Sequence, residues 1–389
     1  MQVAGKRCDS GEVVTLSLVG GRIAAIERGL REPEIGGGDV WVSPGFIDLQ
    51  VNGYRGHDFN IGAWVSADES GEGIAPIFES LARGGTPLLC PTITTNSRDA
   101  MVAALQRLAE TLDANPRLER AVPGIHVEGP YLAAEDGPRG AHPREHVRDP
   151  NWEELQRFQE AAGGRIKIVT LAPEREGALR CIERLAEAGI AAAIGHTGAS
   201  PETIRDAVRA GARMSTHLGN GSHALLPRHP NYVWEQLACD GLYASIITDG
   251  HHLPAAAAKC IARVKGPERL ALVSDAVSLG GLPAGAYLGG RYEVLPTGKV
   301  VTAGTPYLAG AGFLLDTCVA NALRFTGFSL AEVTSCASTI PARILGLEDR
   351  KGHLRVGYDA DLTLFRIPAE GPLDIAAAIC GGEVIYPAR

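Results

Sequence analysis

Eight short apolar runs recur along the middle of the chain, and segments with helical patterning separate them. The runs have the composition of buried strands, and they give way to Gly, Asn or Pro. The segments between them hold good helix formers, and Ser200 stands before Pro201 where a helix N-cap is expected. Strand and helix repeated eight times predict an α/β fold, a (β/α)8 TIM-like barrel. The runs span residues 42–53, 85–96, 121–130, 165–174, 191–199, 213–220, 242–250 and 270–277.

Both ends of the chain have a different pattern, with short strands around glycine turns. Residues 12–43 read as strands, and Gly20-Gly21 suits a hairpin turn. Residues 352–367 and 378–389 have the same character. We expect residues 1–43 plus 352–389 to form a small β-sandwich domain, with residues 44–351 as the barrel between its halves. Residues 280–312 are rich in Gly and β-formers, which predicts a hairpin and loop at the barrel mouth.

Composition narrows the functional classes. The chain of 389 residues is 45% hydrophobic and 21% charged, as is typical of a globular protein. A formal charge of -8 argues against non-specific nucleic-acid binding. The 8 cysteines form no C-x-x-C pair, and there is no basic-then-apolar leader and no run of eighteen apolar residues. We therefore expect reduced thiols, no membrane contact and a cytoplasmic location. No phosphate-loop motif follows a strand.

Four chemically capable residues stand where predicted strands end: Glu128, His196, His217 and Asp275. A single buried histidine is more often a core residue than a ligand, and that reading stays open for each residue taken alone. Together, a carboxylate and two imidazoles from the third, fifth and sixth strands make a ligand set suited to catalytic Zn²⁺, and iron or manganese would accept it too. In a barrel, the strands' carboxyl ends carry the active site.

The chemistry expected of such a site is hydrolysis. A metal lowers the pKa of water toward about 7, which provides hydroxide at neutral pH. Amide hydrolysis also needs a group that takes the water proton and returns it to the leaving amine. Asp275, which ends the eighth strand, is the candidate for this acid/base role.

Eight segments of the chain together resemble the N-acetylglucosamine-6-phosphate deacetylase family of the amidohydrolase superfamily. They are FIDLQVNG, PTITTN, GIHVEGPYL, GAHP, GHTGAS, THLGN, TDGHH and LVSDAV. The resemblance spans the whole barrel, and the flanking PGFID and GYDADL are similar to the places where superfamily members enter and leave it. The resemblance implies that Glu128, His196 and His217 bind the metal and that Asp275 is the acid/base.

The first strand departs from the common superfamily pattern, which has H-x-H for a second metal. This chain has Gln50-Val51-Asn52, whose amides are poor ligands for a transition metal. We therefore expect one divalent ion per subunit, Zn²⁺ in first place with Fe²⁺, Mn²⁺ and Co²⁺ as alternatives, and outer-shell places for Gln50 and Asn52. By resemblance, His126 also lies behind the ligands and orients Glu128 or a water.

The resemblance also implies the substrate contacts. His142 would touch the acetyl carbonyl or the sugar, and Leu308 would line the acetyl pocket. For the phosphate it implies Asn220 with Gly221, Arg228 and His252, where Arg228 reaches the active site of a neighbouring subunit in a homodimer. This chain has Asn220-Gly221-Ser222 where the family has Asn-Ala-Met, so it departs from the family pattern within the phosphate segment.

The function expected from these residues is hydrolytic deacetylation of N-acetyl-D-glucosamine 6-phosphate to D-glucosamine 6-phosphate and acetate. One alternative is a deacetylase for another N-acetyl amino-sugar phosphate, such as the galactosamine epimer, or for an N-acyl amino acid. Another is a barrel used for binding without catalysis. Retention of all four strand-end residues argues against the binding barrel.

Overall fold

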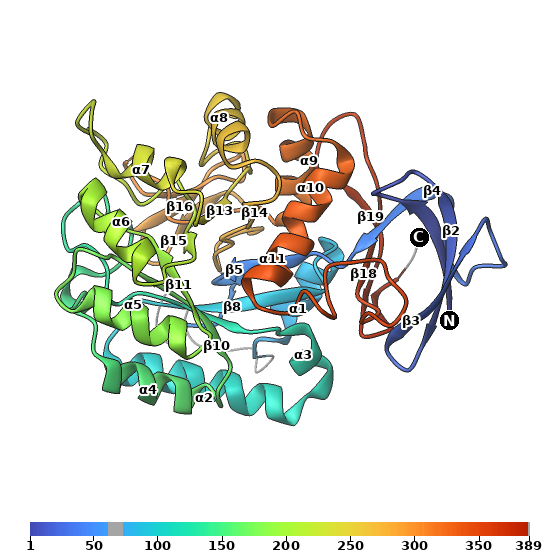
Figure 1. Cartoon of the computed structure of the whole chain (residues 1–389), viewed down its shortest axis with the longest axis horizontal. Coiled ribbons are helices and arrows are strands. Elements are labelled where there is room, and N and C mark those ends of the chain that lie inside the picture. The colour runs from blue at the N-terminus through green and yellow to red at the C-terminus, as the bar shows by residue number, and fades with distance from the viewer. Residues whose placement is uncertain (61–72, 306, 388–389) are drawn as a thin grey trace.

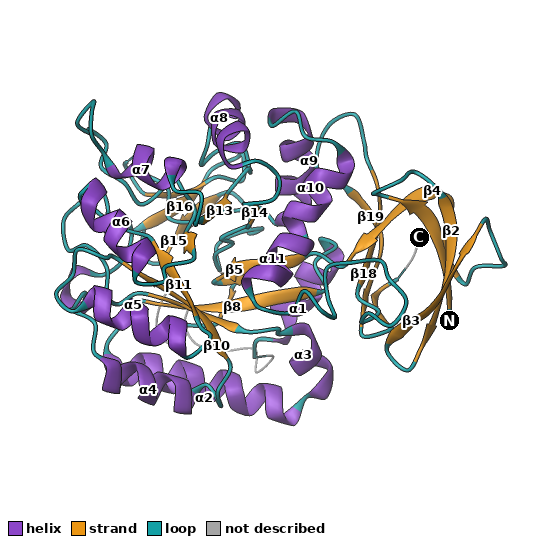
Figure 2. Cartoon of the chain, in the orientation of Figure 1, coloured by secondary structure: helices purple, strands orange, loops and turns teal. Residues whose placement is uncertain are grey.

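An eight-stranded parallel sheet forms the centre of the molecule, with helices outside it (Figures 1 and 2). The computed structural model describes residues 1–60, 73–305 and 307–387. Each predicted apolar run supplies one strand, which confirms the (β/α)8 barrel. In sheet order the strands are β14 (Leu270–Leu272), β13 (Tyr243–Ile246), β12 (Met214–Ser215), β11 (Ala191–Ile194), β10 (Ile166–Leu171), β9 (Ile125–Glu128), β8 (Leu88–Thr94) and β5 (Ile47–Val51).

The first and last strands of this sheet meet just beyond the end of β14. Asn52 N donates to the Ala276 carbonyl at 2.8 Å, and Asp275 N donates to the Gln50 carbonyl at 3.0 Å. These bonds close the barrel, as an edge-free sheet requires. The seam therefore brings Gln50 and Asn52 beside Asp275.

Helices cover the outside of the barrel and bury their apolar faces against it. The Ser200 hydroxyl accepts a hydrogen bond from Thr203 N at 3.2 Å, so the predicted N-cap is confirmed. The helices are α1 (Ala75–Arg83), α2 (Arg98–Ala114), α3 (Pro116–Ala121), α4 (Trp152–Ala161), α5 (Ala178–Glu187), α6 (Pro201–Arg209), α7 (Tyr232–Ala238), α8 (Ala255–Lys265), α9 (Leu315–Phe325), α10 (Leu330–Ala337) and α11 (Thr339–Ile344), with a 3-10 turn at Arg144–His146.

Both chain ends enter one seven-stranded sheet beside the barrel, at the right of Figure 1. Its order is β20 (Glu383–Tyr386), β19 (Asp374–Cys380), β18 (Leu362–Arg366), β4 (Ile35–Pro44), β1 (Gln2–Arg7), β2 (Val13–Val19) and β3 (Arg22–Arg28). Neighbouring strands are antiparallel except β1 and β4. Gly20 and Gly21 have φ of 57° and 78° at the β2–β3 turn, conformations that glycine adopts without strain.

Smaller sheets lie in the loops of the barrel. The predicted hairpin region forms β15 (Gly285–Tyr287), β16 (Tyr292–Val294) and β17 (Val300–Thr302), and β6 (Gly53–Tyr54) pairs with β7 (His57–Asp58). All eight cysteines are free thiols. In the described parts of the chain no helix is both long and apolar enough to span a bilayer. Residues 61–72 and 306 of the predicted barrel and 388–389 of the predicted small domain lie outside the described residues.

Lys265 joins the end of α8 to the last turn of α7 and the loop that follows it. Its buried ammonium group donates to the carbonyls of Gln236, Cys239 and Leu242 at 2.6, 2.9 and 3.1 Å. We expect Lys265→Met to lower the free energy of unfolding by about 1–3 kcal/mol, because it leaves buried carbonyls without a donor. Urea unfolding measures the loss. Lys259→Met, an exposed change on the same helix, is the control, and equal stability of the two variants would contradict this account.

Candidate active site

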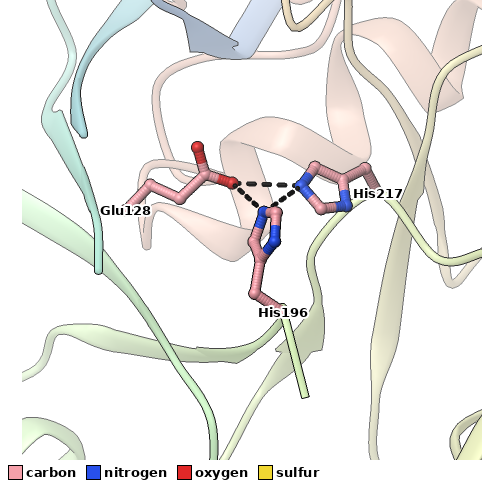
Figure 3. Close-up of side chains that lie close together, drawn as sticks. All are labelled: Glu128, His196 and His217. Carbon is pink, nitrogen blue, oxygen red and sulfur yellow. Dashed lines mark hydrogen bonds and ion pairs between the residues drawn. The ribbon is translucent and has the colours of Figure 1, made fainter. Parts of the chain in front are cut away.

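Glu128, His196 and His217 converge at the carboxyl ends of the barrel strands (Figure 3). Glu128 is the last residue of β9, and the two histidines follow β11 and β12. The Glu128 Oε1 atom lies 3.0 Å from His217 Nε2 and 3.3 Å from His196 Nε2, and the two Nε2 atoms are 3.1 Å apart. All three side chains are buried. The three predicted ligands are therefore brought together at the spacing that a metal site needs.

The chemistry of this donor set fits a divalent metal ion. His196 Nδ1 lies 2.8 Å from the Pro138 carbonyl and donates to it, which fixes the ring so that Nε2 faces Glu128 and His217. His217 Nδ1 is buried without a partner among the described residues. One carboxylate oxygen and two imidazole nitrogens are ligands that Zn²⁺, Fe²⁺ and Mn²⁺ accept.

Glu128 has the ionisation state that a ligand requires. Burial raises the pKa of its carboxyl group, but hydrogen bonds and charge from His196 and His217 outweigh burial and leave the pKa well below its usual range. Glu128 is therefore a carboxylate at neutral pH.

Asp275 follows β14 and is tied to the ligand group through Gln50. One amide nitrogen, Gln50 Nε2, donates to Glu128 Oε1 at 2.9 Å and to Asp275 Oδ1 at 3.1 Å. Asn52 Nδ2 adds a bond to Asp275 Oδ1 at 2.8 Å. Burial, then the negative charge of Glu128, raises the pKa of Asp275 to about 6. This second carboxyl group therefore holds a proton more readily than an ordinary aspartate, which suits proton transfer.

Three of these four residues have left-handed backbone conformations. The φ angles are 50° at His196, 31° at His217 and 53° at Asp275. Such angles are uncommon for residues with a Cβ, and their energetic cost concentrates at functional sites. The strand-to-loop turns therefore aim these side chains into the barrel mouth at a cost in backbone strain.

His142, the residue expected to contact the acetyl carbonyl or the sugar, lies beside the ligand group. It sits in the loop after β9, and its Nε2 is 3.2 Å from His196 Nε2. Burial, then the charge of His196, lowers the pKa of His142 to about 3. The ring is therefore neutral at physiological pH and has one N–H to donate.

His126 does not make the contact expected of it. Its Nδ1 lies 3.1 Å from the Leu49 carbonyl and its Nε2 lies 2.8 Å from Thr170 Oγ1, so its hydrogen bonds go to the barrel interior and not to Glu128. Thr170 Oγ1 in turn lies 2.7 Å from Thr216 Oγ1, in the residue before His217. His126 was expected to orient Glu128 or a water, and the hydrogen bond to Glu128 comes from Gln50.

Of the residues predicted to bind phosphate, Asn220 and Gly221 lie next to the ligand histidines, and Arg228 does not contact them in the described structure. Asn220 N and Nδ2 both donate to the His217 carbonyl, at 2.9 and 3.3 Å, which fixes the turn after this ligand. Gly221 packs against the His196 ring, where a Cβ would lie 2.7 Å from Nδ1. Arg228 is exposed, in the segment before α7. Within the described residues, no contact joins it to Asn220 or Gly221.

Two further predicted residues lie near the eighth strand. The charge of His252 lowers the pKa of Asp275, which places this ring within electrostatic range of the second carboxyl group. Leu308 is half-buried and pairs with Val301. Ala311 N, three residues further on, donates to the Asp275 carbonyl at 3.1 Å. Leu308 therefore belongs to a segment that runs beside the site.

Asp249 was missed at the sequence level, although a signal was present. It stands at the end of the β13 run in the segment ITDG, as Asp275 does after β14. It is buried and accepts a hydrogen bond from His252. Its position after a strand could have marked it.

Comparison with known proteins assigns the chain to a family. The model of the amidohydrolase family matches residues 41–386. The chain belongs to the amidohydrolase family. This amidohydrolase is 35% identical over 372 residues to N-acetylglucosamine-6-phosphate deacetylase of Bos taurus, covering 92% of the chain and 87% of the relative. It is 33% identical over 325 residues to N-acetylgalactosamine-6-phosphate deacetylase of Escherichia coli O157:H7, covering 82% of each.

Solved structures extend the likeness to the whole fold of this amidohydrolase. A mutant of N-acetyl-D-glucosamine-6-phosphate deacetylase from Mycobacterium smegmatis, in complex with N-acetyl-D-glucosamine-6-phosphate, aligns with a TM-score of 0.85 and 28% identity. The alignment covers 99% of both chains.

Gln50 offers a test of the link between the two carboxylates of the amidohydrolase. We expect Gln50→Leu to lower hydrolytic activity about 10–100-fold, the range for residues that orient metal ligands, because Glu128 and Asp275 lose their shared donor. Activity at saturating metal measures the loss, and thermal unfolding checks that the barrel is intact. Gln159→Leu, a change outside the barrel mouth, is the control. Full activity of Gln50→Leu would contradict the role.

Proposed function

We propose that this amidohydrolase removes the acetyl group of N-acetyl-D-glucosamine 6-phosphate and releases D-glucosamine 6-phosphate and acetate. One observation carries the proposal: a buried carboxylate and two imidazoles converge, and Gln50 links them to a second buried carboxyl group, Asp275. This arrangement can combine metal-assisted hydrolysis with proton transfer. The names of the relatives supply the amino-sugar phosphate as the substrate class.

Glu128, His196 and His217 would hold one divalent ion per subunit, with Zn²⁺ as the first choice and Fe²⁺, Mn²⁺ or Co²⁺ as alternatives. When bound, the ion supplies Lewis-acid chemistry, which lowers the pKa of water and polarises a carbonyl oxygen. Gln50 and Asn52 turn amide N–H groups toward the carboxylates. Because an N–H group is not a ligand, this orientation supports a single-ion site.

Asp275 would carry the proton through the reaction. Its carboxylate takes a proton from the attacking water as the oxygen–carbon bond to the acetyl group forms. The same proton then passes to the sugar nitrogen as the C–N bond breaks, so the products are a free amine and acetic acid, which loses its remaining proton to become acetate. The N–H group of neutral His142 would donate to the carbonyl oxygen as negative charge develops there.

The remaining residues would hold the sugar phosphate. We propose that His252 and the backbone at Asn220 and Gly221 face the phosphate, and that Leu308 lines the acetyl pocket. Exposed Arg228 would act across a homodimer interface. In the sequence, Leu225 and Trp234 lie on either side of Arg228, and they are 91% and 57% exposed. Such exposed apolar side chains are what a partner subunit would cover. We also propose residues 1–43 plus 352–389 and residues 44–351 as the two domains.

Acetate release from a panel of substrates tests this function. The panel is N-acetylglucosamine 6-phosphate, its galactosamine epimer, unphosphorylated N-acetylglucosamine and an N-acetyl amino acid. We expect the highest kcat/KM with the phosphorylated glucosamine compound and a loss of more than about 10-fold without the phosphate, as for a missing charge-assisted hydrogen bond. Faster turnover of the epimer or the amino acid would overturn the substrate assignment and leave the hydrolytic chemistry standing.

A further inference from the structure

Asp249 is a buried carboxylate beside the active site with no role in the reaction derived above. It follows β13, between the ends of the strands that lead to His217 and Asp275. Asp249 Oδ1 accepts hydrogen bonds from the backbone N–H groups of His251 and His252 at 2.8 and 2.9 Å. Its second oxygen, Oδ2, lies 2.8 Å from His252 Nδ1. One carboxylate therefore fixes both the turn and the ring of His252.

The contact with Asp249 determines what His252 offers to a ligand. Because a carboxylate accepts the Nδ1–H group, the tautomer and the ring orientation are set, and Nε2 points away from Asp249. His252 is 5% exposed at its side chain, and among the described residues nothing accepts from its Nε2. Burial raises the pKa of Asp249, but its bonds with His252 outweigh burial and lower it, so the carboxylate persists at neutral pH.

We propose that Asp249 is a positioning residue, which holds His252 so that Nε2 meets an anionic oxygen of the substrate. The inference rests on the proposed function, in which this oxygen belongs to the 6-phosphate. With Nδ1 held by Asp249, the Nε2 side of the ring is left for the substrate, where an N–H group that meets an anionic oxygen forms a charge-assisted hydrogen bond. Asp249 acts only through His252 and does not touch the reacting atoms.

A double-mutant cycle of Asp249→Asn and His252→Gln separates this role from a structural one. Asn keeps an acceptor for the two backbone N–H groups and removes the charge. We expect Asp249→Asn to raise KM for the phosphorylated sugar about 10–100-fold, the range for partners of active-site histidines, with kcat and the KM of the unphosphorylated sugar little changed. The double variant should have a KM for the phosphorylated sugar no higher than that of His252→Gln alone. Additive losses, or a loss in kcat, would overturn the proposal.

Asp361→Asn is the matched control. Asp361 is also buried, and it accepts hydrogen bonds from Lys351 at 2.6 Å and from Gly381 N at 2.7 Å, at the seven-stranded sheet. We expect this variant to lose stability and to keep the KM of both sugars.

A second measurement is independent of the substrate. NMR of ¹⁵N-histidine protein, with the His252 signal identified by its loss in His252→Gln, should show a protonated Nδ1 that changes in Asp249→Asn. An unchanged signal would overturn the positioning role whatever the enzyme hydrolyses. If wild-type protein releases no acetate while the signal changes as expected, the proposed function fails and the link between Asp249 and His252 stands.

Discussion

Replacing Asp275 by Asn is expected to lower kcat about 10²–10⁴-fold, the contribution of a positioned acid/base group. Asn has nearly the same shape, can accept from Gln50 and Asn52 through Oδ1, and tolerates the φ of 53°. It cannot carry a proton between the water and the sugar nitrogen. The change should therefore remove proton transfer and leave the fold, the KM and the metal content near wild type.

Steady-state kinetics and metal analysis of the same sample measure this outcome. Asp240→Asn, an aspartate with a side chain 86% exposed, is the control and should retain full activity. Unchanged turnover by Asp275→Asn with metal bound would rule out the acid/base role. Loss of metal together with activity would instead assign Asp275 to metal binding.

Replacing His217 by Asn is expected to abolish stoichiometric metal binding and to lower activity by more than about 100-fold. Mutation of a residue that only orients a metal ligand lowers metal affinity or activity about 10–100-fold, and removal of the ligand itself lowers them further. Asn is chosen because it accepts the φ of 31°, so the turn after β12 is kept. Its side chain is too short to bring a donor atom to the place of Nε2, 3.0 Å from Glu128 Oε1.

Metal content after dialysis and activity at equal added metal measure the effect. His353→Asn is the control, because this half-buried histidine packs edge-on against Tyr358 in the C-terminal region. Wild-type metal content in His217→Asn would contradict the assignment of His217 as a ligand.

The eight strands and the convergence of the ligands could be predicted from sequence because both depend on local patterns. Strands buried on both faces are nearly continuous apolar runs, and the first residues beyond them must lie at one end of a barrel. Glu128, His196, His217 and Asp275 satisfy that rule and meet at one site. Gln50 and Asn52 were expected behind the ligands, and in the structure they donate hydrogen bonds to Glu128 and Asp275.

The contacts across the barrel could not be predicted, because no sequence pattern encodes them. His126 alternates with Glu128 along β9, which suggested that the two side chains face the same way, yet Leu49 and Thr170 take both its ring nitrogens. The left-handed turns at His196 and His217 also leave no mark, since neither residue is glycine. Arg228 is exposed and makes no contact with Asn220 or Gly221 within the described residues, so its proposed role across a subunit interface could not be judged from the sequence pattern.

Metal-dependent acetate release from N-acetylglucosamine 6-phosphate tests the central claim most directly. Protein stripped with a chelator is titrated with Zn²⁺ while acetate formation from this substrate is followed. Activity should be absent at the start, rise with added metal and level off at one ion per subunit, in step with the metal bound. Full turnover by the stripped protein, or activity that requires two ions per subunit, would contradict a hydrolytic centre built from Glu128, His196 and His217.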